Sequence, residues 1–315
     1  MPDPELEKMK TGINLTEYAA AQGYLLDRKE SSRNSVSMRN PVSGDKIIIA
    51  RGQDDHWIYF SVRDDRDNGS IIDFVQKRQG GSLGVVRKAL RVWLGTGYPK
   101  PAPDTFVRKV EKTTKDKQAV IAKFIRMLDV KEHPYLKSRA VGKEILSLER
   151  FFGRVRIDKK GNAVFPHFDR QGLCGFEIKN KDFTGFAPGG EKGLWESHAF
   201  PNDTRLVVAE SAIDALSYHA LHGTPHSRYV STAGGWDKDK TPDLIRKAAE
   251  ECPGPDVVLA FDNDEQGHEY ETLAKKYLAD SGKNLIVSFP TALKADWNDV
   301  LKGQVFPTPL FQKIK

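Results

Sequence analysis

Short apolar runs alternate with amphipathic segments along the last part of the chain. Segments with apolar residues at helical spacing follow each of the first three runs, for example SAIDALSYHALHG after the first. Continuous apolar strands divided by amphipathic helices are typical of a parallel sheet covered by helices on both faces. The pattern therefore predicts an α/β domain over residues 204–315, with strands in the runs RLVVAE (205–210), RYVSTAGG (228–235), DVVLAFDND (256–264) and NLIVSF (284–289).

Two smaller α+β parts are predicted ahead of this domain. In residues 1–97, a helical pattern precedes the strand-like runs SVSMRN, KIIIARG and HWIYFSV, and a helix then opens at GSIIDFV. In residues 117–203, a helix precedes the strand-like runs FFGRVRID, NAVFPHFD and LCGFEIKN. Residues 98–116, with three prolines among mixed charges, have the composition of an exposed linker.

The composition is that of an ordinary globular protein, with 39% hydrophobic and 29% charged residues in a chain of 315. No apolar run approaches the length of a membrane span, and the start of the chain resembles neither a signal peptide nor a transit peptide. We therefore expect a cytoplasmic protein without a membrane partner. Cys174 and Cys252 are the only cysteines, too few for a disulfide framework or a cysteine-rich zinc site.

Positive charge is concentrated in the middle of the chain. The formal net charge is +6, and residues 108–160 carry 16 Lys or Arg against 7 Asp or Glu. Such an excess is typical of a surface that binds a polyanion, although an isolated charge run is more often a solvated helical surface. Its position beside an acidic domain favours nucleic acid as the partner.

Acidic side chains end two of the predicted parallel strands. Glu210 closes the first strand, and Asp262 and Asp264 close the third, where they point to the same side because side chains alternate along an extended chain. The carboxyl ends of parallel strands meet where ligands bind. Converging carboxylates repel one another unless a cation lies among them, and oxygen ligands select Mg²⁺ or Mn²⁺. A divalent-metal site is therefore predicted here, close to the polar segment KADWNDV with Lys294, Asp296, Asn298 and Asp299.

Each of these features also has an ordinary structural explanation. A glutamate before a helix is usually a cap or a helix-dipole partner, and Asp-Asn-Asp is commonly only a turn. Lys294 is as readily a surface lysine as a phosphate contact. The combination of VVAESAIDALS, AFDNDEQG and KADWND in this order favours a functional site.

Taken together, the three motifs resemble the Toprim domain that bacterial primases, topoisomerases, recombination proteins and certain nucleases share. The resemblance covers residues 206–301. It implies that Glu210 acts in acid/base or metal chemistry and that Asp262 and Asp264 bind magnesium, so that these three are both the catalytic and the metal-binding residues. Asp214 fits the helix after the glutamate in that family, although its spacing also suits an exposed helical position. Additional acidic or phosphate contacts are expected from Asp296, Asp299 and Lys294.

Further resemblances lie ahead of the Toprim motifs. The helix, β-ribbon and GSIIDFV stretch of residues 1–97 resemble the zinc-ribbon domain of bacterial replicative primases, but no cysteine precedes Cys174 and His56 stands alone, so no zinc is expected. An unrelated α+β domain is the alternative. The stretch HPYL, followed by strands, resembles the region that precedes the catalytic core in primase-like proteins of plasmids and mobile elements. That resemblance implies a basic nucleic-acid track formed by Arg139, Lys143, Arg150, Arg154 and Arg156.

The resulting hypothesis is a primase-like enzyme that joins nucleotides on a single-stranded DNA template during replication of a plasmid or mobile element. Its partners would be DNA and nucleotides, with a replication or mobilisation protein as a further one. A Toprim nuclease in plasmid processing or phage defence would need the same carboxylates, and a non-catalytic DNA-binding accessory factor would need only the basic track. A topoisomerase is disfavoured because it needs a tyrosine nucleophile on a further large domain. The sequence leaves the first three alternatives open.

Overall fold

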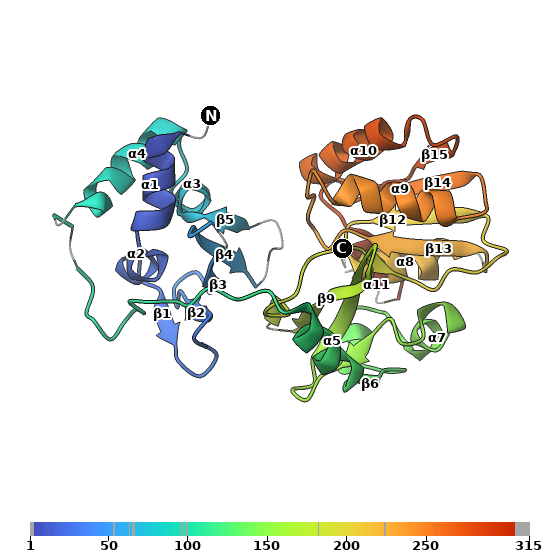
Figure 1. Cartoon of the computed structure of the whole chain (residues 1–315), viewed down its shortest axis with the longest axis horizontal. Helices are drawn as coiled ribbons and strands as arrows, with labels where there is room; N and C mark the ends of the chain where they lie inside the picture. The colour runs from blue at the N-terminus through green and yellow to red at the C-terminus, as the bar shows by residue number, and fades with distance from the viewer. Residues whose placement is uncertain are drawn as a thin grey trace, which may run out of the picture. The chain divides into compact units, whose positions relative to one another are not determined.

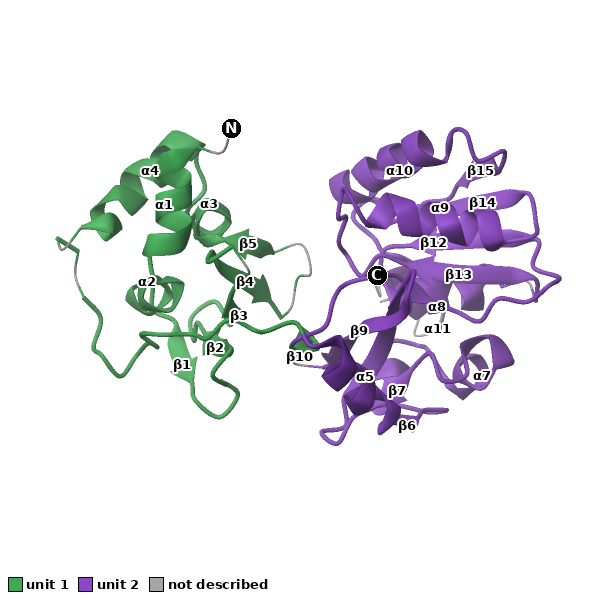
Figure 2. Ribbon diagram, viewed as in Figure 1, with its two compact units in different colours: residues 1–115, 182–188 green, residues 116–181, 189–315 purple. Residues whose placement is uncertain are grey.

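The computed structural model describes residues 3–52, 54–62, 64, 67–95, 97–98, 100–181, 183–223 and 225–305 (Figure 1). The chain divides into two compact units, one of residues 1–115 and 182–188 and the other of residues 116–181 and 189–315 (Figure 2). None of the helices in the described ranges has the length and apolar character needed to cross a membrane.

The first unit is built on a five-stranded antiparallel sheet in the order β1-β2-β3-β4-β5. Its helices pack on this sheet, and the rings of Tyr18 and Tyr59 meet the ring of Phe74 edge to face in the core. The elements are α1 (Pro4–Gly12), α2 (Leu15–Ala21), β1 (Leu25–Asp27), β2 (Ser35–Arg39), β3 (Lys46–Arg51), β4 (Trp57–Ser61), β5 (Asn68–Ser70), α3 (Ile71–Gln79), α4 (Leu83–Arg91) and the 3-10 helix η1 (Val92–Leu94).

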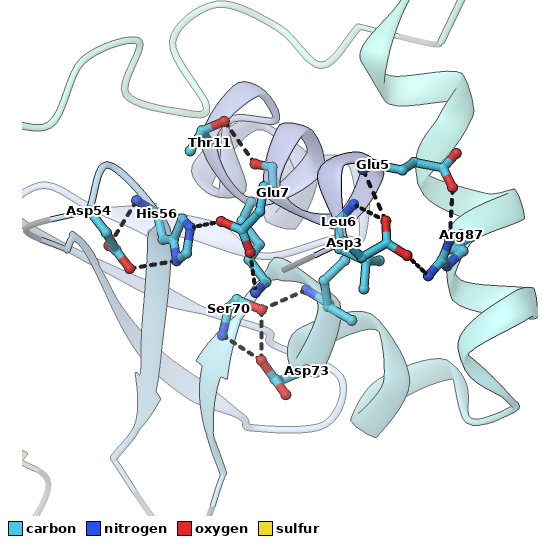
Figure 3. A network of polar contacts seen from close by, with 12 residues as sticks. Asp3, Glu5, Leu6, Glu7, Thr11, Asp54, His56, Ser70, Asp73 and Arg87 are labelled. Atoms are coloured by element: carbon cyan, nitrogen blue, oxygen red, sulfur yellow. Dashed lines mark hydrogen bonds and ion pairs between the residues drawn. The ribbon is translucent and has the colours of Figure 1, made fainter. Parts of the chain in front are cut away.

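Charged side chains tie α1 to its neighbours (Figure 3). Asp3 caps the first turn of α1 and also pairs with Arg87 of α4. His56, in the turn between β3 and β4, lies between two carboxylates, with Glu7 Oε2 2.6 Å from Nε2 and Asp54 Oδ2 2.7 Å from Nδ1. The histidine of the ribbon-like part therefore serves as a link between α1 and the sheet.

Part of the proline-rich segment 98–116 lies along the first unit. The carbonyl of Val107 accepts hydrogen bonds from Asn14 Nδ2 at 2.9 Å and Thr16 Oγ1 at 2.8 Å. Val110 is buried against the core of the unit. The main stretch of the first unit ends at Lys115, so the division between the two units falls at the end of this segment, before its last residue.

The second unit begins with small helices and an antiparallel sheet, whose strands within the unit follow the order β9-β8-β7-β6. Its elements are α5 (Lys117–Ile125), β6 (Leu128–Asp129), α6 (Pro134–Ser138), α7 (Lys143–Leu146), the 3-10 helix η2 (Glu149–Phe151), β7 (Arg156–Ile157), β8 (Ala163–Asp169) and β9 (Gly172–Asn180). The next strand, β10 (Phe183–Phe186), lies in the short segment that groups with the first unit.

The rest of the second unit is a five-stranded sheet in the order β11-β13-β12-β14-β15, parallel except for the short outer strand β11. On the other side β15 is the outermost strand, and Ile286 and Val287 on it remain 41% and 37% exposed. The elements are β11 (Trp195–Glu196), β12 (Arg205–Ala209), α8 (Ala212–His222), β13 (Ser227–Ser231), α9 (Thr241–Glu251), β14 (Asp256–Ala260), α10 (Glu265–Leu278), β15 (Asn284–Val287) and α11 (Trp297–Val305).

Two hydrophobic layers flank this sheet, because alternate strand residues face opposite sides. Val207 and Ala209 pack with residues of α8 and α11, whereas Leu206 and Val208 pack with α9 and α10. The predicted α/β class, a mostly parallel sheet with helices on both faces after antiparallel α+β parts, is confirmed. The first of these layers also contains residues from 116–203, namely Leu136, Val141, Ile145, Leu146, Phe151, Val155, Ala163, Phe165 and Trp195.

Candidate active site

The carboxyl ends of β12 and β14 lie side by side, because the two strands are parallel neighbours with Ala209 opposite Ala260. The chain leaves β12 for β13 on one side and returns to β14 on the other, which creates the strand-order switch where α/β sheets bind ligands. Glu210 directly follows β12, and its Oε1 accepts a hydrogen bond from the backbone N–H of Asp262 at 3.3 Å. The structure therefore brings these two predicted residues together.

Asp262 is a partly buried carboxyl with several acidic neighbours. Burial raises its pKa, and the negative charges of Asp214, Glu210, Asp296 and Asp264 raise it further. Its Oδ1 is buried and has no hydrogen-bond partner among the described residues. A bound cation would stabilise such a buried carboxylate oxygen, which lacks a hydrogen-bond donor and lies beside other acidic groups.

Asp264 serves as a helix cap in the structure. Its Oδ1 accepts a hydrogen bond from the N–H of Gly267 at 2.9 Å at the start of α10. The structural explanation weighed for the Asp-Asn-Asp turn therefore applies to this residue. The cap involves one oxygen of the carboxylate. It holds Asp264 in the same turn as Asp262.

Asp214 lies inside the site and not on an exposed helical surface. It is only 5% exposed, and it accepts hydrogen bonds from Ser211 Oγ at 2.5 Å and from the backbone N–H of Asn298 at 3.2 Å. Burial raises the pKa of Asp214, as does the charge of Asp296, whereas these hydrogen bonds and the positive charge of Lys179 oppose the rise.

The three charged residues of KADWNDV have different surroundings. Burial raises the pKa of Asp296, and the charge of Asp299 adds to the effect. Asp299 itself is exposed and pairs with Lys302 at 2.7 Å, one helical turn along α11. Lys294 is exposed, with a φ of 62° that turns the chain so that its N–H donates to the carbonyl of Asn263. Of the three, Asp296 is the residue whose charge is among the largest causes that raise the pKa of Asp262.

The donor set fits a hard divalent cation, because it consists of carboxylate oxygens, one of them buried and unpartnered. Within the described part of the chain, no three or more His, Cys, Asp or Glu side chains are already arranged to hold a metal ion. The neighbouring carboxylates are thus near enough to raise the pKa of Asp262 but are not gathered into a closed cage. Asp262, Asp264 and Glu210 are the residues that would hold Mg²⁺ or Mn²⁺.

Arg150, which was predicted to contact nucleic acid, is buried in the second unit. Its side chain is 5% exposed and forms a bidentate salt bridge with Asp203, at 2.6 and 3.1 Å. It also donates to the carbonyl groups of His198 and Pro225, so its hydrogen-bonding capacity is directed into the protein. Charge counting along a sequence cannot distinguish such a buried arginine from a surface one.

Arg154 and Arg156 are also engaged within the second unit. The guanidinium of Arg154 lies 4.6 Å from the ring of Phe168, and burial lowers the pKa of Arg154. Arg156 lies over Phe124 at the same distance and pairs with Asp129 at 3.0 Å. These two arginines contact residues around the antiparallel sheet, and the basic track expected from the sequence stays a prediction.

The remaining two residues of the expected track are placed differently. Lys143 is exposed at the start of α7. Arg139, which ends α6, extends toward the acidic site, with a guanidinium nitrogen 4.0 Å from Asp296 Oδ2 and a side chain 32% exposed. Arg139 is therefore the one basic residue of the predicted set that the structure brings to the carboxylates.

Sequence reasoning named Asn298 in the polar segment near the site but gave it no contacts, and it missed Lys179. Asn298 is fully buried and donates from Nδ2 to the carbonyl of Arg139 at 2.6 Å and to Ser217 Oγ at 2.9 Å. Lys179 on β9 is 5% exposed, pairs with Glu177 at 3.3 Å and lowers the pKa of Asp214. The charges alternating with apolar residues in FEIKN read as a solvent-facing strand side, which concealed Lys179.

Comparisons with known proteins agree with this layout. Residues 207–301 match the Toprim-like family (Toprim_2), and residues 134–203 match a family described as a protein of unknown function (DUF3991). No curated protein matches the chain.

Among solved structures, the chain is similar to the primase fragment of the bacteriophage T7 primase-helicase protein, with 20% identity over 61% of this chain and 76% of that one and a TM-score of 0.42. It is also similar to the zinc-binding and RNA polymerase domains of the Aquifex aeolicus primase, with 14% identity over 97% and 83% and a TM-score of 0.39. At these low scores the likenesses assign neither a fold nor a function to this chain. The family match shows that the carboxylates at the ends of β12 and β14 lie within a Toprim-like domain.

Proposed function

We propose that the chain is a primase-like, metal-dependent nucleotidyltransferase that joins nucleotides on single-stranded DNA. The observation that carries this proposal is the pair Glu210 and Asp262 at the ends of neighbouring parallel strands, joined by a 3.3 Å hydrogen bond and with one Asp262 oxygen buried and unpartnered among the described residues. The order of parts supports it, because a ribbon-like unit and a basic stretch precede the Toprim-like domain.

The proposed roles follow from the positions of the side chains. Asp262 and Asp264 would hold Mg²⁺ or Mn²⁺, and the buried Glu210 would complete the set or move a proton at its carboxylate. When bound, such a cation stabilises negative charge on the attacking and leaving oxygens of phosphoryl transfer. Arg139, near Asp296, would orient a phosphate group of the nucleotide or of the template. Replication of a plasmid or mobile element is the proposed setting, with a replication or mobilisation protein as a partner.

A single assay tests the proposal. The protein is incubated with labelled single-stranded DNA, four ribonucleotides of which one carries a second label, and Mg²⁺ or Mn²⁺, and both labels are followed on one gel. Short products carrying the nucleotide label, made by the wild type and lost in Glu210→Gln, are the expected result. Shortened template without incorporation would replace the proposal with a nuclease. No change with either metal would overturn it in favour of an accessory DNA-binding role.

A further inference from the structure

We propose that Asn263 is the positioning residue of the acidic site: its side chain anchors the turn that carries Asp262 and Asp264 to the loop 288–296, and so sets the spacing of the two carboxylates for a divalent cation. The inference rests on the proposed function, because it assumes that these carboxylates hold a metal. It assigns a role to the middle residue of the motif, which would not itself touch the metal.

The contacts between Asn263 and the loop are numerous for one turn residue. Its Nδ2 donates to the carbonyl of Pro290 at 2.9 Å and to that of Ala292 at 3.3 Å. Its backbone N–H donates to the carbonyl of Ala295 at 3.1 Å, and its carbonyl accepts from the N–H of Lys294 at 2.7 Å. The turn is therefore fixed to the loop by both the main chain and the side chain of one residue.

The same side chain also contacts the helix that follows. Its Oδ1 lies 3.2 Å from Nε2 of His268, on the second turn of α10, and the ring of His268 lies 4.4 Å from that of Phe289 in the loop. His268 thus contacts both Asn263 and the loop to which Asn263 is bound. Asp264, the next residue, caps the start of α10. A shift of Asn263 would therefore disturb both this cap and the contact with His268.

These contacts distinguish Asn263 from an ordinary turn former. An asparagine that shapes a turn bonds to backbone groups two or three residues away. The carbonyl partners of Asn263 lie 27 and 29 positions along the chain. Its amide therefore joins two segments that are remote in sequence, one with the candidate metal ligands and the other with Asp296.

Spacing matters because Mg²⁺ demands near-ideal octahedral geometry and because groups that orient metal ligands typically change metal affinity by about 10–100-fold when removed. Mn²⁺ binding, followed through the loss of the free-ion electron paramagnetic resonance signal, tests the inference without reference to catalysis. Wild type is compared with Asn263→Ala and Asn263→Asp, and Asp262→Asn supplies a reference that lacks the site.

The matched control is Asn284→Ala. Asn284 donates from Nδ2 to Asp256 Oδ1 at 3.1 Å at the opposite end of β14 and β15, and it is exposed. Like Asn263, it loses one side-chain amide on substitution, but far from the carboxylates. Melting temperatures of all variants establish that each is folded before metal binding is compared.

The expected result is Mn²⁺ binding about tenfold weaker in Asn263→Ala, with Asn284→Ala equal to wild type. Asn263→Asp keeps the size of the side chain but turns a carboxylate oxygen toward the carbonyls of Pro290 and Ala292, so it should bind Mn²⁺ at least as weakly. Tighter binding by Asn263→Asp would overturn the proposal, because it would make residue 263 a direct ligand.

Other outcomes separate this inference from the proposed function. Binding by both Asn263 variants equal to that of Asn284→Ala would overturn the positioning role. Mn²⁺ binding by the wild type without nucleotide incorporation would refute the primase-like activity while the comparison of variants still decides the role of Asn263. A wild type that binds no Mn²⁺ would overturn the inference.

Discussion

Asp262 places function and stability in opposition at a single residue. Burial and the negative charges of four neighbouring acidic residues both disfavour the ionised form of its carboxyl group. Because these effects raise the pKa of Asp262, the metal-free fold must either bury a charge or bind a proton at this carboxyl. Asp262→Asn supplies a neutral side chain and removes this cost, so we expect the melting temperature measured at neutral pH without divalent metal to rise, by about 2–4 °C for each kcal/mol gained. Nucleotide incorporation should be lost in the same variant. A variant that is both active and less stable than the wild type would contradict this assignment.

Arg150 illustrates the opposite case of a charged residue used for stability. Arg150→Ala leaves Asp203 as an uncompensated buried charge, which typically costs about 3–5 kcal/mol of unfolding free energy. The control is Arg170→Ala, whose exposed pair with Asp243 should contribute less than about 1 kcal/mol. Urea denaturation of both variants measures the difference. Equal stability of the two, with DNA binding weakened only in Arg150→Ala, would restore the nucleic-acid role.

At the scale of elements, α10 approaches the site so closely that its third residue must be glycine. A Cβ on Gly267 would lie 2.0 Å from the carbonyl oxygen of Asp262 and 3.0 Å from Glu210 Oε1. Gly267→Ala should displace the start of α10, lower the melting temperature and abolish nucleotide incorporation. Gly303→Ala on α11 is the control, because nothing lies within 4 Å of its Cβ position and alanine favours a helix. Equal melting temperatures and equal nucleotide incorporation in the two variants would contradict the close approach of α10 to Asp262 and Glu210.

The packing of α8 on β13 makes stability depend on pH. Burial lowers the pKa of His219 from its ordinary value of 6.5 to about 4, and its Nδ1 lies 3.0 Å from the hydroxyl of Tyr229. Between these pH values the unfolded chain binds a proton that the folded chain does not, so stability falls as the pH drops from 6.5 toward 4. His219→Phe should flatten this part of the curve of unfolding free energy against pH. Parallel curves for wild type and variant would show that His219 does not contribute.

Sequence patterns were sufficient for the four parallel strands, because apolar strand runs divided by amphipathic helices leave strong periodic signals. They also located Glu210 and Asp262, since a residue that ends a parallel strand has a defined place in the sheet. Patterns were not sufficient for Arg150, Arg154 and Arg156. The direction of a long basic side chain depends on partners remote in sequence, such as Asp203, which no local pattern encodes.

At the scale of the whole molecule, the chain contains two units with separate cores. We expect calorimetry of the full chain to resolve two unfolding transitions, because each unit can lose its core without the other. Mn²⁺ at about 100 times its dissociation constant should add about 2.7 kcal/mol to the transition of the second unit only, and a chelator should reverse the shift. Asp262→Asn should abolish the shift. Stabilisation of both transitions, or of the first alone, would place the metal elsewhere.

The outermost position of β15 has a consequence for how copies of the protein behave at high concentration. An outer strand presents a row of backbone donors and acceptors on which another chain can add a strand, and Ile286 and Val287 are partly exposed on it. β15 has only four residues, and short outer strands are one of the devices that limit such templated aggregation. The side chains of β15, Asn284 to Val287, carry no charge that would repel an added strand. The shortness of β15 is therefore the feature that limits pairing of this sheet edge with another copy of the protein.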